Sequence, residues 1–355
     1  MPPRRVVVTG TAMVTTIGPR VFELLPDLGE AASSGTGLQN SEVSPGPLAD
    51  AVVAGGTSPR DARRMAEFAQ LAVYASRRLI ARGDRGDLSA QLQSLAGVVI
   101  GNSIGGAEQV DAQMHKLQQR GPERVSAFFI PLIMVNAAAG QVAIENRLTG
   151  PALGVSNGLQ SSIAAVAEAV DCIQQGNADQ MICGAVEVFG SYASLNSLLD
   201  DEDVDKLRAA DEASSGLVGG VMLLEEFESA CSRQASMLAE VCSAAVTLST
   251  KPSACDSMRV DGLTDDAVRT NSAPHGRESR TQPFTLPAGL QGIHRHVLGP
   301  MLMAEACSGM TAASTSASSG AVDERPVETA EVQTVALTAT CPLGYKGRLC
   351  LQPIG

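Results

Sequence analysis

Four stretches of this chain are almost continuously apolar, and they limit the possible folds more than any other feature. They are residues 4–18, 95–106, 178–188 and 216–226, with runs such as "VVVTG", "AGVVIG" and "QMICGAV". A strand with one wet face alternates polar and apolar residues, so an unbroken apolar run is typical of a strand covered on both faces. Patterns with helical spacing, such as residues 59–83, separate these strands. The alternation predicts an α/β fold with parallel or mixed sheets.

Composition excludes several classes of protein. The 355 residues are 44% hydrophobic, enough for a large core or two fused halves, and the formal net charge of -12 argues against nucleic acid or an anionic membrane as the main partner. No run reaches the ~18 to 20 apolar residues of a membrane helix. The start, "MPPRRVVVTG", passes directly into a strand and does not resemble a signal peptide, so we expect a cytoplasmic protein.

Metal and cofactor sites are not indicated. The eight cysteines form no CxxC pair, which argues against a zinc or redox motif. His294 and His296 form an HxH pair without an acidic or cysteine partner at ligand spacing, so we interpret them as structural. We therefore expect no metal and no cofactor. The Gly-, Ser- and Pro-rich stretch 31–59 predicts a loop.

The stretch from Pro151 to Val170 predicts a buried strand, a sharp turn and a helix that begins near Ser161. Nucleophiles are often held at such elbows, because a helix N-terminus stabilises developing negative charge. Here the tip carries Leu159 followed by Gln160, and no cysteine or histidine lies near it in the sequence. The pattern thus indicates the scaffold of a catalytic elbow without its nucleophile.

Several motifs together resemble the β-ketoacyl synthases of fatty acid and type II polyketide assembly. They are "VVVTGTAMVTTIG", "RRMAEFAQLAVYASRRLI", "GNSIGG", "FFIPLIMVNAAAGQVAIENRLTGPALGVS", "GNADQMICGAVEV" and "GLVGGVMLLEE", which span most of residues 4–226. The resemblance implies a thiolase-like α/β fold of two fused halves with central mixed sheets, layered α-β-α-β-α. We assign the N-terminal ketosynthase-like half to residues 1–233 and a shortened C-terminal half to residues 234–355.

The catalytic motifs of the family are altered in this chain. Active members carry a cysteine at the elbow that aligns with Leu159, and leucine cannot hold an acyl group as a thioester. A one-residue slip would instead align Gln160 with the glutamine that chain-length factors carry there. The family's two histidines correspond to His275, in a shortened His-Gly run, and to His296 in "QGIHRHVLG", where Gln291 replaces a lysine. The C-terminal gating loop is reduced to "CPLGYKG".

The resemblance therefore implies a non-catalytic subunit, the chain-length factor of a type II polyketide synthase. It implies a heterodimer with an active ketosynthase subunit, an acyl carrier protein bound by the complex, and an acyl tunnel whose shape sets polyketide chain length. The shortened second half leads us to expect a linear, reduced or polyene product. The resemblance also places Ile104, Val110, Met114 and Phe129 near the tunnel and the interface, although the helical spacing of Val110, Met114 and Leu117 alone favours ordinary core.

Two other functions stay open from the sequence. One is a working acyltransferase-family enzyme: a divergent β-ketoacyl synthase, or a thiol-independent decarboxylase of malonyl-carrier protein that uses Gln160, His275 and His296. Decarboxylation without a thiol is chemically reasonable because only an enolate needs stabilising. The other is a homodimeric scaffold that binds carrier protein alone.

Overall fold

The computed structural model describes residues 3–17, 20–27, 37–44, 46–82, 96–103, 105–158, 160–188, 217–248, 280–283, 300–301, 304, 333–340, 345–352 and 354. The strands are β1 (Val6–Ile17), β2 (Arg20–Asp27), β3 (Gly37–Ser44), β4 (Ala96–Gly101), β5 (Ala152–Val155), β6 (Gln180–Val188), β7 (Leu217–Glu226), β8 (Ala239–Leu248), β9 (Arg280–Pro283), β10 (Gln333–Thr340) and β11 (Tyr345–Gln352). The helices are α1 (Leu48–Ala54), α2 (Pro59–Ala62), α3 (Glu67–Arg82), α5 (Ala107–Arg120), η1 (Pro122–Arg124), α6 (Phe129–Ile133), α7 (Ala137–Asn146), α8 (Ser161–Gln174) and α11 (Phe227–Ser232).

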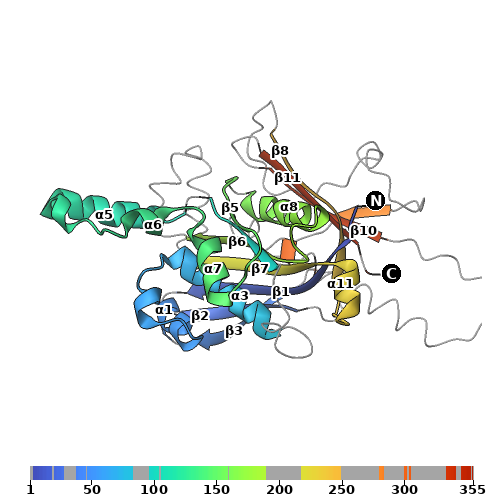
Figure 1. Ribbon diagram of the computed structural model, residues 1–355, viewed down its shortest axis with the longest axis horizontal. Helices are drawn as coiled ribbons and strands as arrows, with labels where there is room; N and C mark the ends of the chain where they lie inside the picture. Colours follow the sequence, from blue (N-terminus) through green and yellow to red (C-terminus); the bar gives the residue numbers. More distant parts are fainter. Residues whose placement is uncertain are drawn as a thin grey trace, which may run out of the picture.

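The described strands join in one curled, mixed sheet (Figure 1). Its order is β5-β4-β6-β7-β1-β8-β11-β10-β9, and β2 and β3 extend from β1 as further antiparallel strands. Strand β4 is parallel to both β5 and β6, whereas β7 is antiparallel to β6 and β1. The two halves meet where β1 pairs with β8 through only two residue pairs, Val7 with Glu240 and Val8 with Ala239. The two central sheets implied by the resemblance are thus linked through this short junction.

Helix α8 lies inside the curl of the sheet (Figure 1). It packs against β4 and β6 of the first half and against β8 and β11 of the second, and its side chains share one buried cluster with residues of these strands. Helices α3 and α7 cover the opposite face of the first half. The described elements therefore follow the order α-β-α-β, which fits the thiolase-like layering expected from the sequence.

Strand β6 shows why the strands are continuously apolar. Met181 and Cys183 point into the cluster around α8, whereas Ile182 and Val186 point into the cluster around α3. Successive side chains of a strand face opposite sides, so a strand with helices on both faces needs apolar residues at every position. This confirms the interpretation of the apolar runs as doubly covered strands.

The loop predicted over residues 31–59 is wrong in part. Strand β3 pairs along the length of β2, and helix α1 follows it. The sequence of β3, "GLQNSEVS", has few strand-forming residues, and its strand is defined by backbone hydrogen bonds to β2.

The boundary proposed between residues 233 and 234 falls between α11 and β8 and stays a prediction. Within the described ranges, no helix is both long and apolar enough to span a bilayer.

Candidate functional site

The turn and the helix start predicted from the sequence are present between β5 and α8. The expectation of a buried strand before the turn is wrong, because β5 ends the order of the described strands and its first two residues, Ala152 and Leu153, are exposed. Gly158 adopts φ +56°, a left-handed conformation that suits glycine, and the amides of Gln160 and Ser161 bond back to the carbonyls of Asn157 and Gly158. The Ser161 hydroxyl accepts from the Asn157 amide at 2.9 Å and lies 2.6 Å from the Gly158 carbonyl oxygen. A single hydroxyl therefore closes the turn, and α8 begins at the predicted residue.

Gln160 occupies the residue before α8, and its side chain is fully buried. Neither its carboxamide nitrogen nor its carboxamide oxygen has a hydrogen-bond partner among the residues that the structure describes. Buried polar atoms in native proteins are nearly always hydrogen-bonded, so this carboxamide is unusual for a buried side chain. The elbow thus holds a polar group of unassigned function one residue after Leu159.

Four of the sequence-predicted site residues, Leu159, His275, His296 and Ile104, lie outside the described residues. Two of the described cysteines, Cys172 and Cys183, are poorly suited to replace the missing nucleophile. Burial raises the pKa of the Cys183 thiol, and burial together with nearby Glu168 raises that of Cys172. A thiol with a raised pKa is mostly protonated at neutral pH and is a poor nucleophile.

Residues 107–134, which comprise α5, η1 and α6, form a segment that we call the arm, and Figure 1 shows it extending away from the body. Helix α5 packs against α6 and η1. Val110 and Phe129 are partly buried, whereas Met114 is 45% exposed. The core role that helical spacing favoured for this stripe is therefore wrong for Met114. Further exposed apolar side chains of the arm are Leu117, Phe128, Ile130 and Met134.

One acidic residue near the elbow was missed by sequence reasoning. Glu187 lies near the end of β6 and is 5% exposed. Its two carboxylate oxygens accept from the amide and the hydroxyl of Ser103, at 2.6 and 2.7 Å, in the loop after β4. Burial raises its pKa to about 7. The signal was available, because Glu187 is the one charged residue in the apolar run "MICGAVEV".

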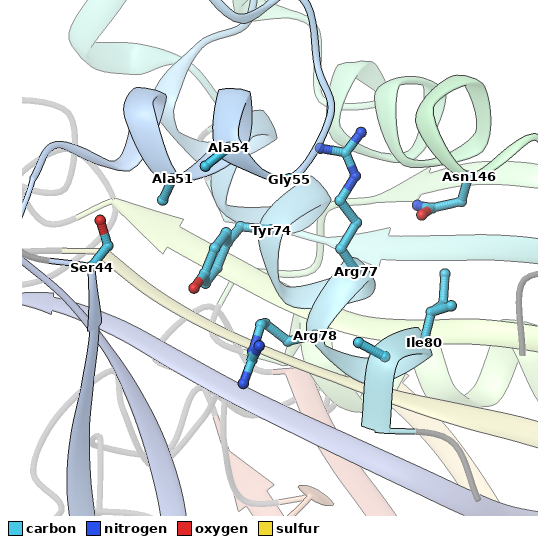
Figure 2. A pocket seen from close by; sticks show the side chains of 10 residues that line it. Ser44, Ala51, Ala54, Gly55, Tyr74, Arg77, Arg78, Ile80 and Asn146 are labelled. Atoms are coloured by element: carbon cyan, nitrogen blue, oxygen red, sulfur yellow. The ribbon is translucent and has the colours of Figure 1, made fainter. Parts of the chain in front are cut away.

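A groove of about 490 Å³ lies over α3, α1 and α7 (Figure 2). Arg77 and Arg78 leave α3 in opposite directions at this groove. Each is paired with a carboxylate, Arg77 with Glu145 and Arg78 with Glu23, so neither guanidinium is left to attract an anionic ligand. We therefore assign no binding function to the groove. Its lining residues are Ser44, Ala51, Ala54, Gly55, Tyr74, Arg77, Arg78, Ile80, Ala81 and Asn146.

Metal binding finds no support in the described part of the chain, where no three His, Cys, Asp or Glu side chains come together as ligands.

Known proteins resemble this chain both in sequence and in structure. The family profile of the β-ketoacyl synthase N-terminal domain matches residues 4–230. A 3-oxoacyl-[acyl-carrier-protein] synthase 2 of Vibrio harveyi is 31% identical over 261 residues, covering 68% of this chain and 62% of that protein. The enzyme of the same name from Staphylococcus aureus (strain COL) is 28% identical over 255 residues, covering 67% and 61%. The chain thus spans about three fifths of the length of these relatives.

Solved structures show the same fold at low identity. A type II polyketide synthase acyl-carrier protein in complex with its ketosynthase bound to the hexaketide matches with TM-score 0.56 at 16% identity, covering 99% of this chain and 100% of that chain. The ishigamide ketosynthase/chain length factor matches with TM-score 0.54 at 20% identity, with coverages of 99% and 100%. An oxazolomycin ketosynthase domain of Streptomyces albus JA3453 matches with TM-score 0.57 at 15% identity, with coverages of 99% and 74%. At these identities the likeness establishes a ketosynthase, thiolase-like fold.

The family profile covers more than half of the chain, and the layers, the elbow and the structural neighbours agree with it. On this evidence, the chain belongs to the β-ketoacyl synthase family.

Proposed function

We propose that the chain is a non-catalytic ketosynthase-like subunit that acts in the cytoplasm as the chain-length factor of a type II polyketide synthase. It pairs with an active ketosynthase subunit, and the pair binds acyl carrier protein. The subunit acts by shape: it walls part of the acyl tunnel and so limits the length of the polyketide, which we expect to be a reduced or polyene chain. Alone, it has no condensing activity.

The exposed arm is the observation that carries this proposal. Met114, Leu117, Phe128, Ile130 and Met134 are between 37% and 59% exposed on one projecting segment. Soluble monomers rarely expose clustered large apolar side chains, and such patches mark association surfaces or ligand grooves. An apolar projection is suited to enter a partner subunit and to line an apolar acyl tunnel there.

The edge of the sheet extends the same surface. Among the described strands, β5 is the outermost beside β4, and Leu153 on it is 38% exposed. Helix α7 packs against β5 and carries Ile144, which is 69% exposed. Open strand edges with apolar neighbours are prone to pair with another chain. The partner therefore buries the edge of β5, the outer side of α7 and the arm together.

Two of the structural neighbours support a type II polyketide assembly. One structural neighbour is described as a ketosynthase/chain length factor and another as a type II ketosynthase in complex with its carrier protein. The catalytic relatives in the sequence comparison are condensing enzymes, whereas this chain has Leu159 where the family's nucleophilic cysteine aligns. A condensing enzyme must hold its acyl group as a thioester, and leucine cannot form one.

Co-expression with a ketosynthase that retains its cysteine tests the proposal. We expect a stable heterodimer that buries well over ~2,000 Å², as obligate pairs do, and poorly behaved oligomers when the chain is expressed alone. A monodisperse monomer at micromolar concentration would contradict the proposal.

An acyl-transfer assay tests the absence of catalysis. The purified chain should take up no radiolabelled acyl group from acyl carrier protein, and Leu159→Cys alone should not restore condensation, because the lysine and the gating loop are also altered. A stable thiol-dependent adduct on this chain would show that it is an enzyme.

The buried carboxamide of Gln160 favours one alternative, a thiol-independent decarboxylase of malonyl-carrier protein. A preorganised amide donor stabilises a developing enolate oxygen. Release of carbon dioxide from malonyl-carrier protein by the chain alone, lost in Gln160→Ala, would support that alternative over the chain-length role.

A further inference from the structure

The arm joins the body at a segment that we call the root, formed by residues 102, 103, 105 and 106 and by residues 132–135, which include the last three residues of the arm. A Cβ on Gly106 would lie only 2.5 Å from the carbonyl oxygen of Leu132, so the two ends of the arm are in close backbone contact. The Asn102 side chain donates from Nδ2 to the carbonyl oxygen of Val135 at 3.0 Å. Because both ends are tied together here, a movement at the root carries the whole arm.

Ser103 connects the root to the sheet. Its amide and hydroxyl both donate to the carboxylate of Glu187, at 2.6 and 2.7 Å, and its carbonyl oxygen accepts from the Ser156 hydroxyl at 3.0 Å. Glu187 belongs to β6, which is paired with β4 on one side and β7 on the other. The carboxylate therefore joins a projecting segment to one of the most enclosed strands of the fold.

A glutamate at position 187 lowers stability because its carboxyl group is buried, which suggests that the residue has a function there. All nine residues of β6 are buried, and an ionised carboxylate in such surroundings is costly. Within the described residues, neither β4, β7 nor the segment 102–106 sets a charged side chain against it: the groups that bond it are the two donors of Ser103. The two bonds to Ser103 offset part of this cost and tie the root to β6, which an apolar side chain at this position could not do.

We propose that Glu187 is a positioning residue that holds the root of the arm to the sheet through Ser103 and so fixes the direction in which the arm meets a partner. The hold on the root stands on the geometry alone, whereas its effect on a partner rests on the chain-length function proposed above.

Hydrogen–deuterium exchange of the full chain, alone and with a co-expressed ketosynthase, tests the hold on the root. In Glu187→Ala, which removes both acceptors, peptides covering residues 107–134 should exchange about tenfold faster than in the wild type, the factor expected from the net loss of one charge-assisted bond. Peptides covering the second half of α8 should keep their protection, because the root contacts this helix at its first residue, where the Ser161 hydroxyl lies 3.1 Å from the Asn102 carbonyl oxygen. Equal exchange of the arm in both proteins, or an equal rise in α8 and the arm, would overturn the proposal.

Two further variants separate positioning from a general loss of stability. Glu187→Gln should restore wild-type protection, since its carbonyl oxygen accepts from the Ser103 amide and its amide nitrogen donates to the Ser103 hydroxyl. Ser103→Ala removes only the hydroxyl bond and should give an intermediate rise, which keeps the test valid if Glu187→Ala does not fold. Failure of the glutamine to restore protection, or no rise in Ser103→Ala, would contradict the proposed hold.

Product analysis of the reconstituted pair then tests the effect on a partner. Glu187→Ala should broaden the distribution of chain lengths at unchanged heterodimer yield, and Glu187→Gln should not. Faster exchange of the arm with unchanged products would leave the hold on the root in place and refute the chain-length role. Unchanged exchange would refute the hold whatever the products are.

Discussion

Helices α8 and α5 are both 14 residues long, and the protein uses them in opposite ways. Helix α8 lies between the two parts of the sheet and buries most of its length. Helix α5 projects in the arm, and only Gln113 is buried among its described side chains. The buried residues of α8 are Ser161, Ser162, Ile163, Ala164, Ala165, Val166, Ala169, Val170 and Ile173.

The comparison separates apolar residues that stabilise the fold from those that remain for association. Ile163 of α8 is 1% exposed inside the main cluster, whereas Met114 of α5 is 45% exposed. Part of the free energy of burying Met114 is therefore not gained within this chain and is available to a partner. Core substitutions should therefore change stability, and arm substitutions should change assembly or products.

The largest effect on stability should come from a substitution in the buried helix α8. Ile163→Ala leaves a cavity between the layers and should lower the free energy of unfolding by about 2–5 kcal/mol. Met114→Ala should change it by no more than about 0.5 kcal/mol, as exposed substitutions usually do. Urea denaturation of the full chain measures both. Equal losses for the two variants would show that the arm is folded against the body in solution.

A smaller effect is expected on the pH dependence of stability, through Glu187 at the junction between the core and the arm. Burial raises the pKa of Glu187 from 4.5 to about 7, so the folded protein binds this proton more tightly than the unfolded chain. The resulting stability is fully present below the unfolded pKa and is lost as the pH rises through about 7. Glu187→Gln removes this dependence, so it should be more stable than the wild type at pH 8 by about 1–3 kcal/mol and equal to it near pH 4.5.

Denaturation midpoints of the two proteins at pH 5, 6, 7 and 8 provide the check, and only their difference is used because other groups also titrate. A constant difference over this range would show that Glu187 titrates normally.

The smallest effect is expected at the start of α8, where the buried carboxamide of Gln160 has no partner among the described residues. Gln160→Leu removes two unsatisfied polar atoms without emptying the site, and it should leave stability unchanged or raise it by about 1 kcal/mol. Thermal denaturation measures this change. A clear loss of stability would show that a water or another group pairs with the amide in solution.

Much of the fold could be predicted from the sequence because its strands are covered on both faces. The runs around Val98 and Ile182 are apolar at every position, which few structures other than a doubly covered strand explain. Strand β3 could not be predicted in this way, because its polar residues carry no periodic signal and its pairing with β2 defines it.

The candidate site could be predicted from the sequence only where residues adjacent in the chain form it. The elbow follows from the order of strand, glycine turn and helix around Gly158. The exposure of Met114 does not follow from its spacing, since helical periodicity identifies an apolar stripe but not what covers it. The pairing of Glu187 with Ser103 joins residues 84 positions apart, and only the packing of β4 beside β6 brings them together.

The most direct test of the chain-length account is mass spectrometry of carrier-bound products from the reconstituted heterodimer. Val110→Phe or Met114→Trp, with the ketosynthase unchanged, should give shorter products at similar heterodimer yield, because added bulk in a packed apolar wall costs about 1–3 kcal/mol and stops elongation earlier. Lys116→Trp, on another side of the same helix, is the matched control and should leave product length unchanged. Unchanged product length in both Val110→Phe and Met114→Trp, with the heterodimer intact, would contradict the account.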